Sequence, residues 1–200
     1  LDTLNMSCSG FYLSSGYTSI GDLRCVFNWN YDKFPNPAKF IERFNSEKIH
    51  LIPNIKPAFL TSHPMYNEIA EKGLFVKNED GTPFVTEFWD GMGSYIDFTL
   101  PEGFKFWHDN VAAKLLDYGI DATWNDNNEF DIKDTDAVAN GFKDGSVKAS
   151  RIRPILTYLM VASSYSAQTE KYPGKRPFLS TRSGSSAVRR LATTWSGDDF

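Results

Sequence analysis

The chain alternates short apolar stretches with stretches whose apolar residues recur at helical spacing. Strands are expected at residues 10–13, 50–55, 176–181 and 192–195 and in the segment that carries Trp124. Helices are expected from Asn36-Pro37 onward and at residues 101–118, 152–168 and 185–191. This β-α order predicts a parallel sheet whose strands are joined by crossover helices.

Polar and aromatic residues follow the predicted strands, as at residues 14–17, 126–129 and 195–199 and at Lys56 and Arg182. In a (β/α)8 TIM barrel these strand ends converge on one face, where the active site is built. A doubly wound sheet also places ligands at strand ends, but neither common Gly-rich phosphate loop is present. We therefore predict an α/β fold of the barrel type.

The length limits how much of a barrel the chain can form. A full barrel needs eight strands and about 250 residues, whereas this chain has 200 residues. We predict that residues 1–200 form part of one catalytic barrel domain, about five of its eight βα units. A long loop is expected over residues 61–99, with a turn at residues 81–83 where a small hairpin fits. Since an open barrel exposes strand edges, this stretch alone is expected to be inactive.

The composition argues against nucleic acids and membranes as binding partners. The chain is 41% hydrophobic with a net charge of −4, so it lacks the basic surface that nucleic-acid binding needs. No apolar run approaches the ~18 residues of a transmembrane helix, and we predict no membrane partner. The chain begins at Leu1 without a signal-like segment, so the native start is expected outside it. Pairing of Cys8 with Cys25 and the oligomeric state stay open.

The segment from Trp124 to Glu129 combines two carboxylates, three amide side chains and a tryptophan. A sugar site needs these types, because carboxylates perform the chemistry, amides bind hydroxyls and an aromatic ring covers the apolar sugar face. Asp126 and Asp198 each follow a short strand and a tryptophan, Trp124 or Trp195. Two facing carboxylates suffice for glycoside hydrolysis, one attacking the anomeric carbon and one protonating the leaving oxygen. Spacing alone also fits two solvated loop aspartates.

The neighbouring candidates have structural alternatives. Arg182 suits sugar hydroxyls or a carboxylate, but equally a structural ion pair at the barrel rim. Glu129 either orients its neighbours or caps a loop, and Trp89 either stacks on sugar or packs in the core. Trp124 and Asn125 are predicted to line the pocket.

Other chemistries lack their signatures. No pair of histidines has zinc-ligand spacing, so we predict no metal site. No Gly-x-Ser-x-Gly nucleophile elbow is present, and the acidic run near Asp126 lacks the glycine of an EF-hand loop.

At these residues the chain resembles glycoside hydrolase family 31, the α-glucosidase and α-xylosidase family. The segment 124–129 resembles the family's Trp-x-Asp-Met-Asn-Glu nucleophile motif, Arg182-Ser183 its Arg-Ser motif, and residues 195–198 its Trp-x-Gly-Asp acid/base motif. The resemblance implies a retaining mechanism on α-glycosides, most simply α-glucosides, without metal or organic cofactor. Asp126 would form the covalent intermediate, Asp198 would act as general acid and base, and Arg182 would hold hydroxyls of the reacting sugar. Trp124, Trp195 and Trp89 would wall the pocket.

The chain departs from the family pattern at two places. Ser14-Ser15-Gly16-Tyr17 stands where an Asp-x-Asp-Tyr is frequent, and Lys56-Pro57 stands where Asp-Pro is common. Both affect substrate preference, so the sugar stays open. The N-terminal β-sandwich and the last barrel strands of the family are expected outside this sequence. Transglycosylation by the same site, or binding of carbohydrate without catalysis, are the alternatives.

Overall fold

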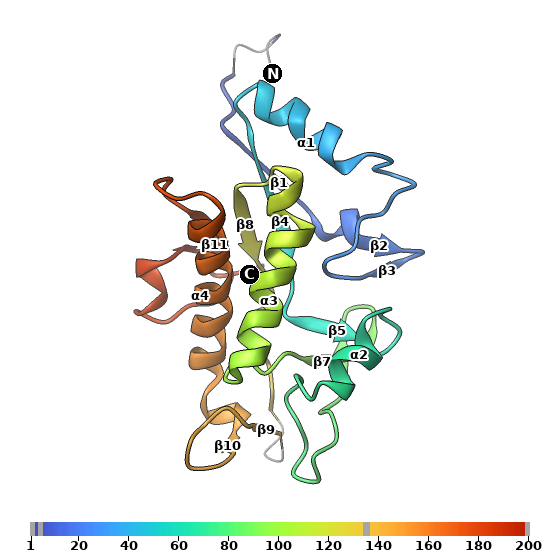
Figure 1. The fold of residues 1–200 in the computed structure, drawn as a ribbon, viewed down its shortest axis with the longest axis vertical. Helices are drawn as coiled ribbons and strands as arrows, with labels where there is room; N and C mark the ends of the chain where they lie inside the picture. The colour runs from blue at the N-terminus through green and yellow to red at the C-terminus, as the bar shows by residue number, and fades with distance from the viewer. Residues whose placement is uncertain (1–2, 4–5, 134–136, 199–200) are drawn as a thin grey trace.

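The computed structural model describes residue 3 and residues 6–133 and 137–198. Its central sheet has five strands in the order β1-β4-β8-β11-β12, and every neighbouring pair is parallel. These strands are β1 (Gly10–Leu13), β4 (His50–Ile55), β8 (Ala122–Asn125), β11 (Phe178–Thr181) and β12 (Thr193–Thr194). The predicted parallel sheet is confirmed; β1 and β12 are its two edge strands, and β1, β4, β8 and β11 are labelled in Figure 1.

The crossover helices also follow the prediction. They are α1 (Pro37–Ser46), α3 (Pro101–Lys114) and α4 (Arg153–Lys171). The Asn36 side chain accepts a hydrogen bond from the backbone N–H of Lys39 at 2.9 Å, which caps α1 as Asn before Pro predicts. Helices α3 and α4 lie side by side on one face of the sheet (Figure 1). The helix expected at residues 185–191 is only a short 3-10 turn, Val188–Arg190.

The segment 61–99 is more ordered than the predicted loop. It contains α2 (Tyr66–Glu71), β6 (Thr86–Phe88) and β7 (Gly91–Tyr95), and with β5 (Ala58–Leu60) it forms an antiparallel sheet of order β5-β7-β6. The turn at residues 81–83 does join a small hairpin, since Phe84 N–H donates to the Val76 carbonyl at 2.8 Å. The short strands and their glycines hid this sheet from sequence patterns. A Cβ at Gly93 would lie 2.5 Å from the Phe59 carbonyl, so the pairing of β7 with β5 requires glycine there.

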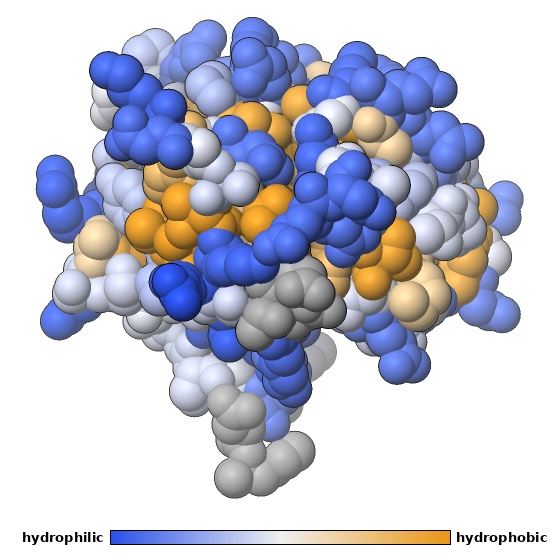
Figure 2. Space-filling model, turned by 90° about the horizontal axis from the view of Figure 1, so that it is seen from below, coloured by the Kyte–Doolittle hydropathy of each residue, from blue (hydrophilic) through white to orange (hydrophobic). Residues whose placement is uncertain are grey.

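Small elements complete the connections. They are the strands β2 (Ser19–Ile20), β3 (Leu23–Arg24), β9 (Val138–Ala139) and β10 (Val147–Lys148) and the 3-10 turns Ser15–Thr18, Leu116–Tyr118 and Ala149–Arg151. Cys8 and Cys25 are both free thiols. None of the helices in the described part of the chain is long and apolar enough to cross a membrane. Seen from below, the surface is mainly hydrophilic, and its hydrophobic patches are separated by polar side chains (Figure 2).

A buried polar chain joins the two large helices to the sheet. Trp107 on α3 is fully buried and donates from Nε1 to Ser164 Oγ on α4 at 2.9 Å. Ser164 in turn donates to Asn125 Oδ1 on β8 at 2.9 Å. The Trp107 ring packs on Phe27 and Phe98, with centroids at 4.7 and 5.4 Å. The hydrogen bonds fix the register of the helix layer on the strand that leads into Asp126.

Candidate active site

Side-chain alternation along β8 decides which predicted residues reach the site. Thr123 accepts a hydrogen bond from Gln168 Nε2 at 3.0 Å, and Asn125 accepts one from Ser164 at 2.9 Å. Both side chains therefore face helix α4, and Trp124 and Asp126 face the opposite side of the sheet. Asn125 is fully buried, and its amide nitrogen donates to the Ser180 carbonyl at 3.5 Å. The polar atoms of Asn125, which was predicted to line the pocket, are thus engaged between strand and helix.

Asp126 is buried at the end of β8, with its side chain 8% exposed. Its Oδ2 accepts from Asn54 Nδ2 at 2.8 Å and from Lys56 Nζ at 2.6 Å. Its Oδ1 accepts from the backbone N–H of Asn127 at 2.9 Å. Burial alone would raise the pKa of Asp126, but the charge of Lys56 and the hydrogen bonds from Asn54 and Lys56 outweigh it and hold the pKa below its ordinary value. Asp126 is therefore ionised at neutral pH.

Arg182, at the end of β11, joins three carboxylates. Its Nε lies 3.0 Å from Glu129 Oε1. Its Nη1 lies 3.6 Å from Asp126 Oδ1 and 3.3 Å from Asp198 Oδ2. Because both aspartate oxygens contact the same nitrogen, they are less than about 7 Å apart, which includes the ~5–5.5 Å separation of retaining glycosidases. The structure thus brings Asp126, Asp198, Arg182 and Glu129 together.

Asn128 holds the segment that carries Arg182. This residue is fully buried, donates to Thr181 Oγ1 at 2.8 Å and accepts from the Ser183 N–H at 3.0 Å. The residues before and after Arg182 are thereby tied to the loop that carries Asp126. Asn127 on the same loop has φ 49°, a left-handed conformation that asparagine tolerates better than most residues.

Aromatic rings flank the carboxylates. Trp124 contacts Trp195 edge-on, with centroids 5.7 Å apart, and on its other side contacts Tyr12 at 5.5 Å. Trp89 stands apart from this group, because it packs on Phe88 and lies over Lys56, whose Nζ is 4.3 Å from the ring centroid. The indole N–H groups of Trp89 and Trp124 are buried without a hydrogen-bond partner among the described residues. Both tryptophans therefore have a donor left for a further partner.

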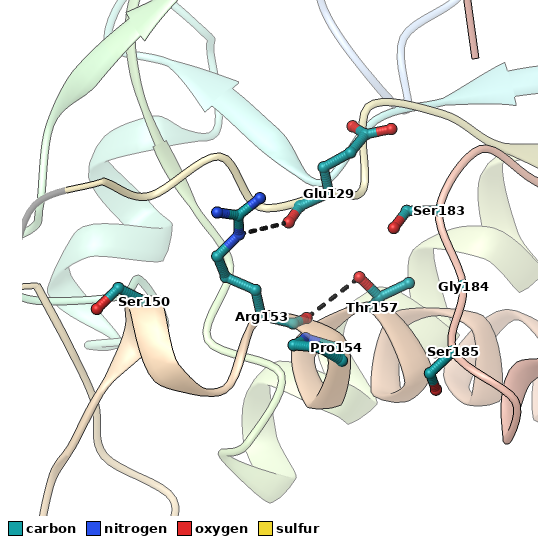
Figure 3. A pocket seen from close by; sticks show the side chains of 8 residues that line it. All are labelled: Glu129, Ser150, Arg153, Pro154, Thr157, Ser183, Gly184 and Ser185. Carbon is teal, nitrogen blue, oxygen red and sulfur yellow. Dashed lines mark hydrogen bonds between the residues drawn. The ribbon is translucent and has the colours of Figure 1, made fainter. Parts of the chain in front are cut away.

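Two pockets border the segment that follows Arg182. One, of about 500 Å³, is lined by Arg182, Trp195 and Glu129, with Ser183, Gly184, Thr194 and Ser196. The other, of about 510 Å³, shares Glu129, Ser183 and Gly184 and extends along the start of α4 to Arg153 and Thr157 (Figure 3). In this second pocket Arg153 Nε donates to the Glu129 carbonyl at 3.2 Å. Both hollows thus border Ser183 and Gly184, and both include Glu129 of the carboxylate cluster.

Two residues near the site, Asn54 and Asn128, were not predicted individually, and Lys56 was noted only as a strand-end residue that affects substrate preference. Asn54 and Lys56 donate to Asp126 directly, whereas Asn128 bonds to Thr181 and Ser183 on either side of Arg182. A signal existed for two of them, since Asn54 is a polar residue inside an apolar strand and Lys56 is a cation at a strand end. Asn54 and Lys56 are two apart, so both point to the side of the sheet on which Asp126 lies. Across the described residues, no three His, Cys, Asp or Glu side chains form a group that could hold a metal ion.

Comparison with known proteins places this geometry in a family. The family described as "Glycosyl hydrolases family 31 TIM-barrel domain" matches residues 1–200. The chain is 29% identical over 181 residues to alpha-glucosidase 2 of Bacillus thermoamyloliquefaciens, which covers 87% of this chain and 23% of that protein. It is 28% identical over 182 residues to the glucosidase 2 subunit alpha of Saccharomyces cerevisiae, covering 86% of this chain and 19% of that protein. The chain thus spans about a fifth to a quarter of these relatives.

Solved structures show the same fold. The dextranase of Flavobacterium johnsoniae complexed with glucose superposes with a TM-score of 0.82 at 21% identity, covering 96% of this chain and 24% of that one. A glucosidase II alpha subunit bound to DNJ gives a TM-score of 0.84 at 24% identity, with 99% and 22% covered. The predicted partial α/β barrel is therefore confirmed, and the chain belongs to glycoside hydrolase family 31.

Proposed function

We propose that this chain carries the catalytic carboxylates of a retaining α-glycosidase that hydrolyses terminal α-glucosides. The observation that carries the proposal is the shared contact of Asp126 and Asp198 with one nitrogen of Arg182. An ionised, buried carboxylate beside a second carboxylate is the pair that glycoside hydrolysis requires. The relatives named alpha-glucosidases support an α-glucoside as substrate.

In the first step Asp126 attacks the anomeric carbon while Asp198 gives its proton to the leaving oxygen. The bond from the anomeric carbon to the leaving group breaks, and a glycosyl ester of Asp126 forms. In the second step water attacks the same carbon, Asp198 takes a proton from that water, and Asp126 leaves as carboxylate. Trp124 and Trp195 flank the reacting sugar.

Arg182 serves both steps. Its guanidinium is always charged and contacts both aspartates, so it is placed to offer donors to the hydroxyls of a sugar bound between them. The side chain of Asp198 is 83% exposed in the free chain. A general acid works best out of bulk water, and a sugar bound over the pair would cover Asp198. Glu129 keeps Arg182 in place from its other side.

The remaining walls of the site are proposed to come from other residues of a longer protein. β1 and β12 are edge strands in the described sheet, whereas a closed barrel has no edges. Residues 1–200 would then be part of one catalytic barrel domain, and a preparation of this stretch alone is expected to be inactive. Activity experiments therefore use the full-length protein that contains this sequence.

The stereochemistry of the first product tests the proposal. Hydrolysis of an aryl α-glucoside is followed by proton NMR, and the first glucose released is expected to be the α anomer. Initial release of the β anomer would contradict a retaining mechanism, and absence of turnover across a panel of aryl α-glycosides would favour a carbohydrate-binding protein. Formation of longer oligosaccharides at high substrate would show that a sugar replaces water in the second step.

A further inference from the structure

Lys56 is the closest cation to Asp126. It follows directly after β4, and its side chain is only 11% exposed. Its Nζ lies 2.6 Å from Asp126 Oδ2, donates to Asn127 Oδ1 and sits over the Trp89 ring at 4.3 Å. A buried lysine in this position is costly unless its charge is matched, so its contacts indicate a defined task.

We propose that Lys56 is a positioning residue that, with Asn54, holds Oδ2 of Asp126 and leaves Oδ1 as the attacking atom. This inference rests on the proposed role of Asp126 as nucleophile. Beyond that role, it specifies which oxygen of Asp126 attacks the sugar and which of the two reaction steps Lys56 accelerates.

The two oxygens of Asp126 have different surroundings. Oδ2 accepts from Asn54 at 2.8 Å and from Lys56 at 2.6 Å, both from β4 and its end. Among the described residues, Oδ1 accepts only the backbone N–H of Asn127, at 2.9 Å, and lies on the side of Arg182, 3.6 Å from the nitrogen that also contacts Asp198. The sugar must lie between the two catalytic carboxylates, so the oxygen on the Arg182 side is the one that can reach the anomeric carbon.

The charge of Lys56 acts in opposite directions in the two steps. When Oδ1 bonds to the anomeric carbon, the anionic charge of Asp126 is lost and Oδ2 becomes the carbonyl oxygen of the ester. Lys56 stabilises the free carboxylate more than this neutral ester, so it slows formation of the ester. When water displaces Oδ1, the charge returns to Asp126 beside Lys56, so the same cation speeds the second step.

Two other cations, Arg182 and Arg24, lie near Lys56 and Asp126, and both are engaged by other carboxylates. Arg182 faces Asp126 from β11, but it is shared with Glu129 and Asp198. Arg24 on β3 faces Lys56 and is paired with Asp90 at 3.4 Å. Removal of the Lys56 charge therefore changes the field at Oδ2 directly, while these ion pairs stay in place.

Lys56→Met in the full-length protein removes the charged amine and keeps an unbranched side chain that is one atom shorter. With an aryl α-glucoside that has a good leaving group, we expect steady-state turnover to fall ten- to a hundredfold, the loss typical of a displaced reacting group. The second step becomes limiting, so rapid mixing shows a burst of phenolate and intact-mass analysis shows accumulated glycosyl-enzyme. The acid limb of the kcat/KM profile moves to higher pH, because burial then raises the pKa of Asp126 without the opposing cation.

Two further variants separate charge from packing. Lys56→Arg keeps a cation, and we expect it to restore the wild-type acid limb and remove the burst. Lys72→Met is the matched control, because Lys72 forms an exposed i,i+4 pair with Glu68 and its loss should leave both readouts unchanged. If Lys56→Met does not fold, Lys56→Gln is measured instead and is expected to show the same burst and the same shifted limb.

Failure of this inference differs from failure of the proposed function. If Asp126→Asn is inactive but the neutral Lys56 variants show no burst and an unchanged acid limb, the role of Lys56 is wrong and the nucleophile stands. If Asp126→Asn turns over at the wild-type rate, the proposed function itself is wrong.

Discussion

Gly197 lies directly against the guanidinium of Arg182. A Cβ at this glycine would come within 2.7 Å of Arg182 Nε and 3.2 Å of its Cζ, and its φ is +90°. The segment that ends in Asp198 can therefore approach Arg182 only because position 197 has no side chain. The glycine of the Trp-x-Gly-Asp sequence thus sets the contact between Arg182 and Asp198.

Substitution of this glycine is expected to affect activity through Arg182. Gly197→Ala should push the guanidinium away from Asp198 and lower kcat/KM about a hundredfold, since small displacements in a site cost this much. Steady-state kinetics of the full-length protein give the measurement. Gly174→Ala is the control, because Gly174 also has a positive φ, of +82°, but a Cβ added there would meet no atom within 4 Å. Equal losses in the two variants would mean that backbone strain, and not the contact with Arg182, is responsible.

Replacement of Arg182 by lysine is expected to lower activity although the positive charge is kept. Lysine offers one point charge where Arg182 reaches Glu129 through Nε and two aspartates through Nη1. Arg182→Lys should reduce kcat/KM by about a hundredfold or more, as loss of a preorganised charge does, while Arg189→Lys on the exposed turn should have no effect. An active Arg182→Lys enzyme would show that the three-carboxylate contact is structural only.

Ser164 is expected to matter for stability. Ser164→Ala leaves the Trp107 Nε1 donor and the Asn125 Oδ1 acceptor buried without this partner. We expect a loss of about 2 kcal/mol or more in the free energy of unfolding, measured by urea denaturation. Ser166→Ala, half-buried on the same helix, should cost much less. Similar losses of unfolding free energy in both variants would contradict a stabilising role for the hydrogen bonds of Ser164.

Protonation of Asp126 at acid pH should lower the stability of the protein. Its folded-state pKa lies below its unfolded value, so it contributes stability above the unfolded pKa of ~3.9, and this contribution is lost as the pH falls through the folded pKa. Compared with Asp126→Asn, the wild-type protein should lose more unfolding free energy between about pH 5 and pH 2. Parallel stability curves for the two proteins would contradict the depressed pKa.

Local sequence patterns were sufficient to predict the parallel strands and the three crossover helices α1, α3 and α4. Local chemistry fixes a boundary at the Asn36-Pro37 start of α1, at the apolar run of β4 and at the left-handed Gly119 that ends the 3-10 turn after α3. The rule that polar residues gather at strand ends also predicted Asp126, Arg182 and Asp198 at one place. Sequence patterns missed the sheet β5-β7-β6, because its strands have three to five residues and depend on the close approach at Gly93.

The direction in which each side chain points could not be predicted from the polar run that carries Asp126. Asn125 and Asp126 are neighbours in the same polar run, yet the alternation of β8 sends one to helix α4 and the other to the site. The partners of Asp126 come from residues 54 and 56, about seventy positions earlier, and only the parallel pairing of β4 with β8 brings them close. Such contacts depend on strand register, which local sequence patterns do not contain.

The covalent intermediate on Asp126 can be observed directly. The full-length protein is treated with a 5-fluoro-α-glucosyl fluoride, a substrate whose second step is slow, and the labelled peptide is mapped by mass spectrometry. We expect one glycosyl group per chain, attached to Asp126 and absent from Asp126→Asn. A label on any other residue, Asp198 and Glu129 included, would contradict the assignment of Asp126 as nucleophile.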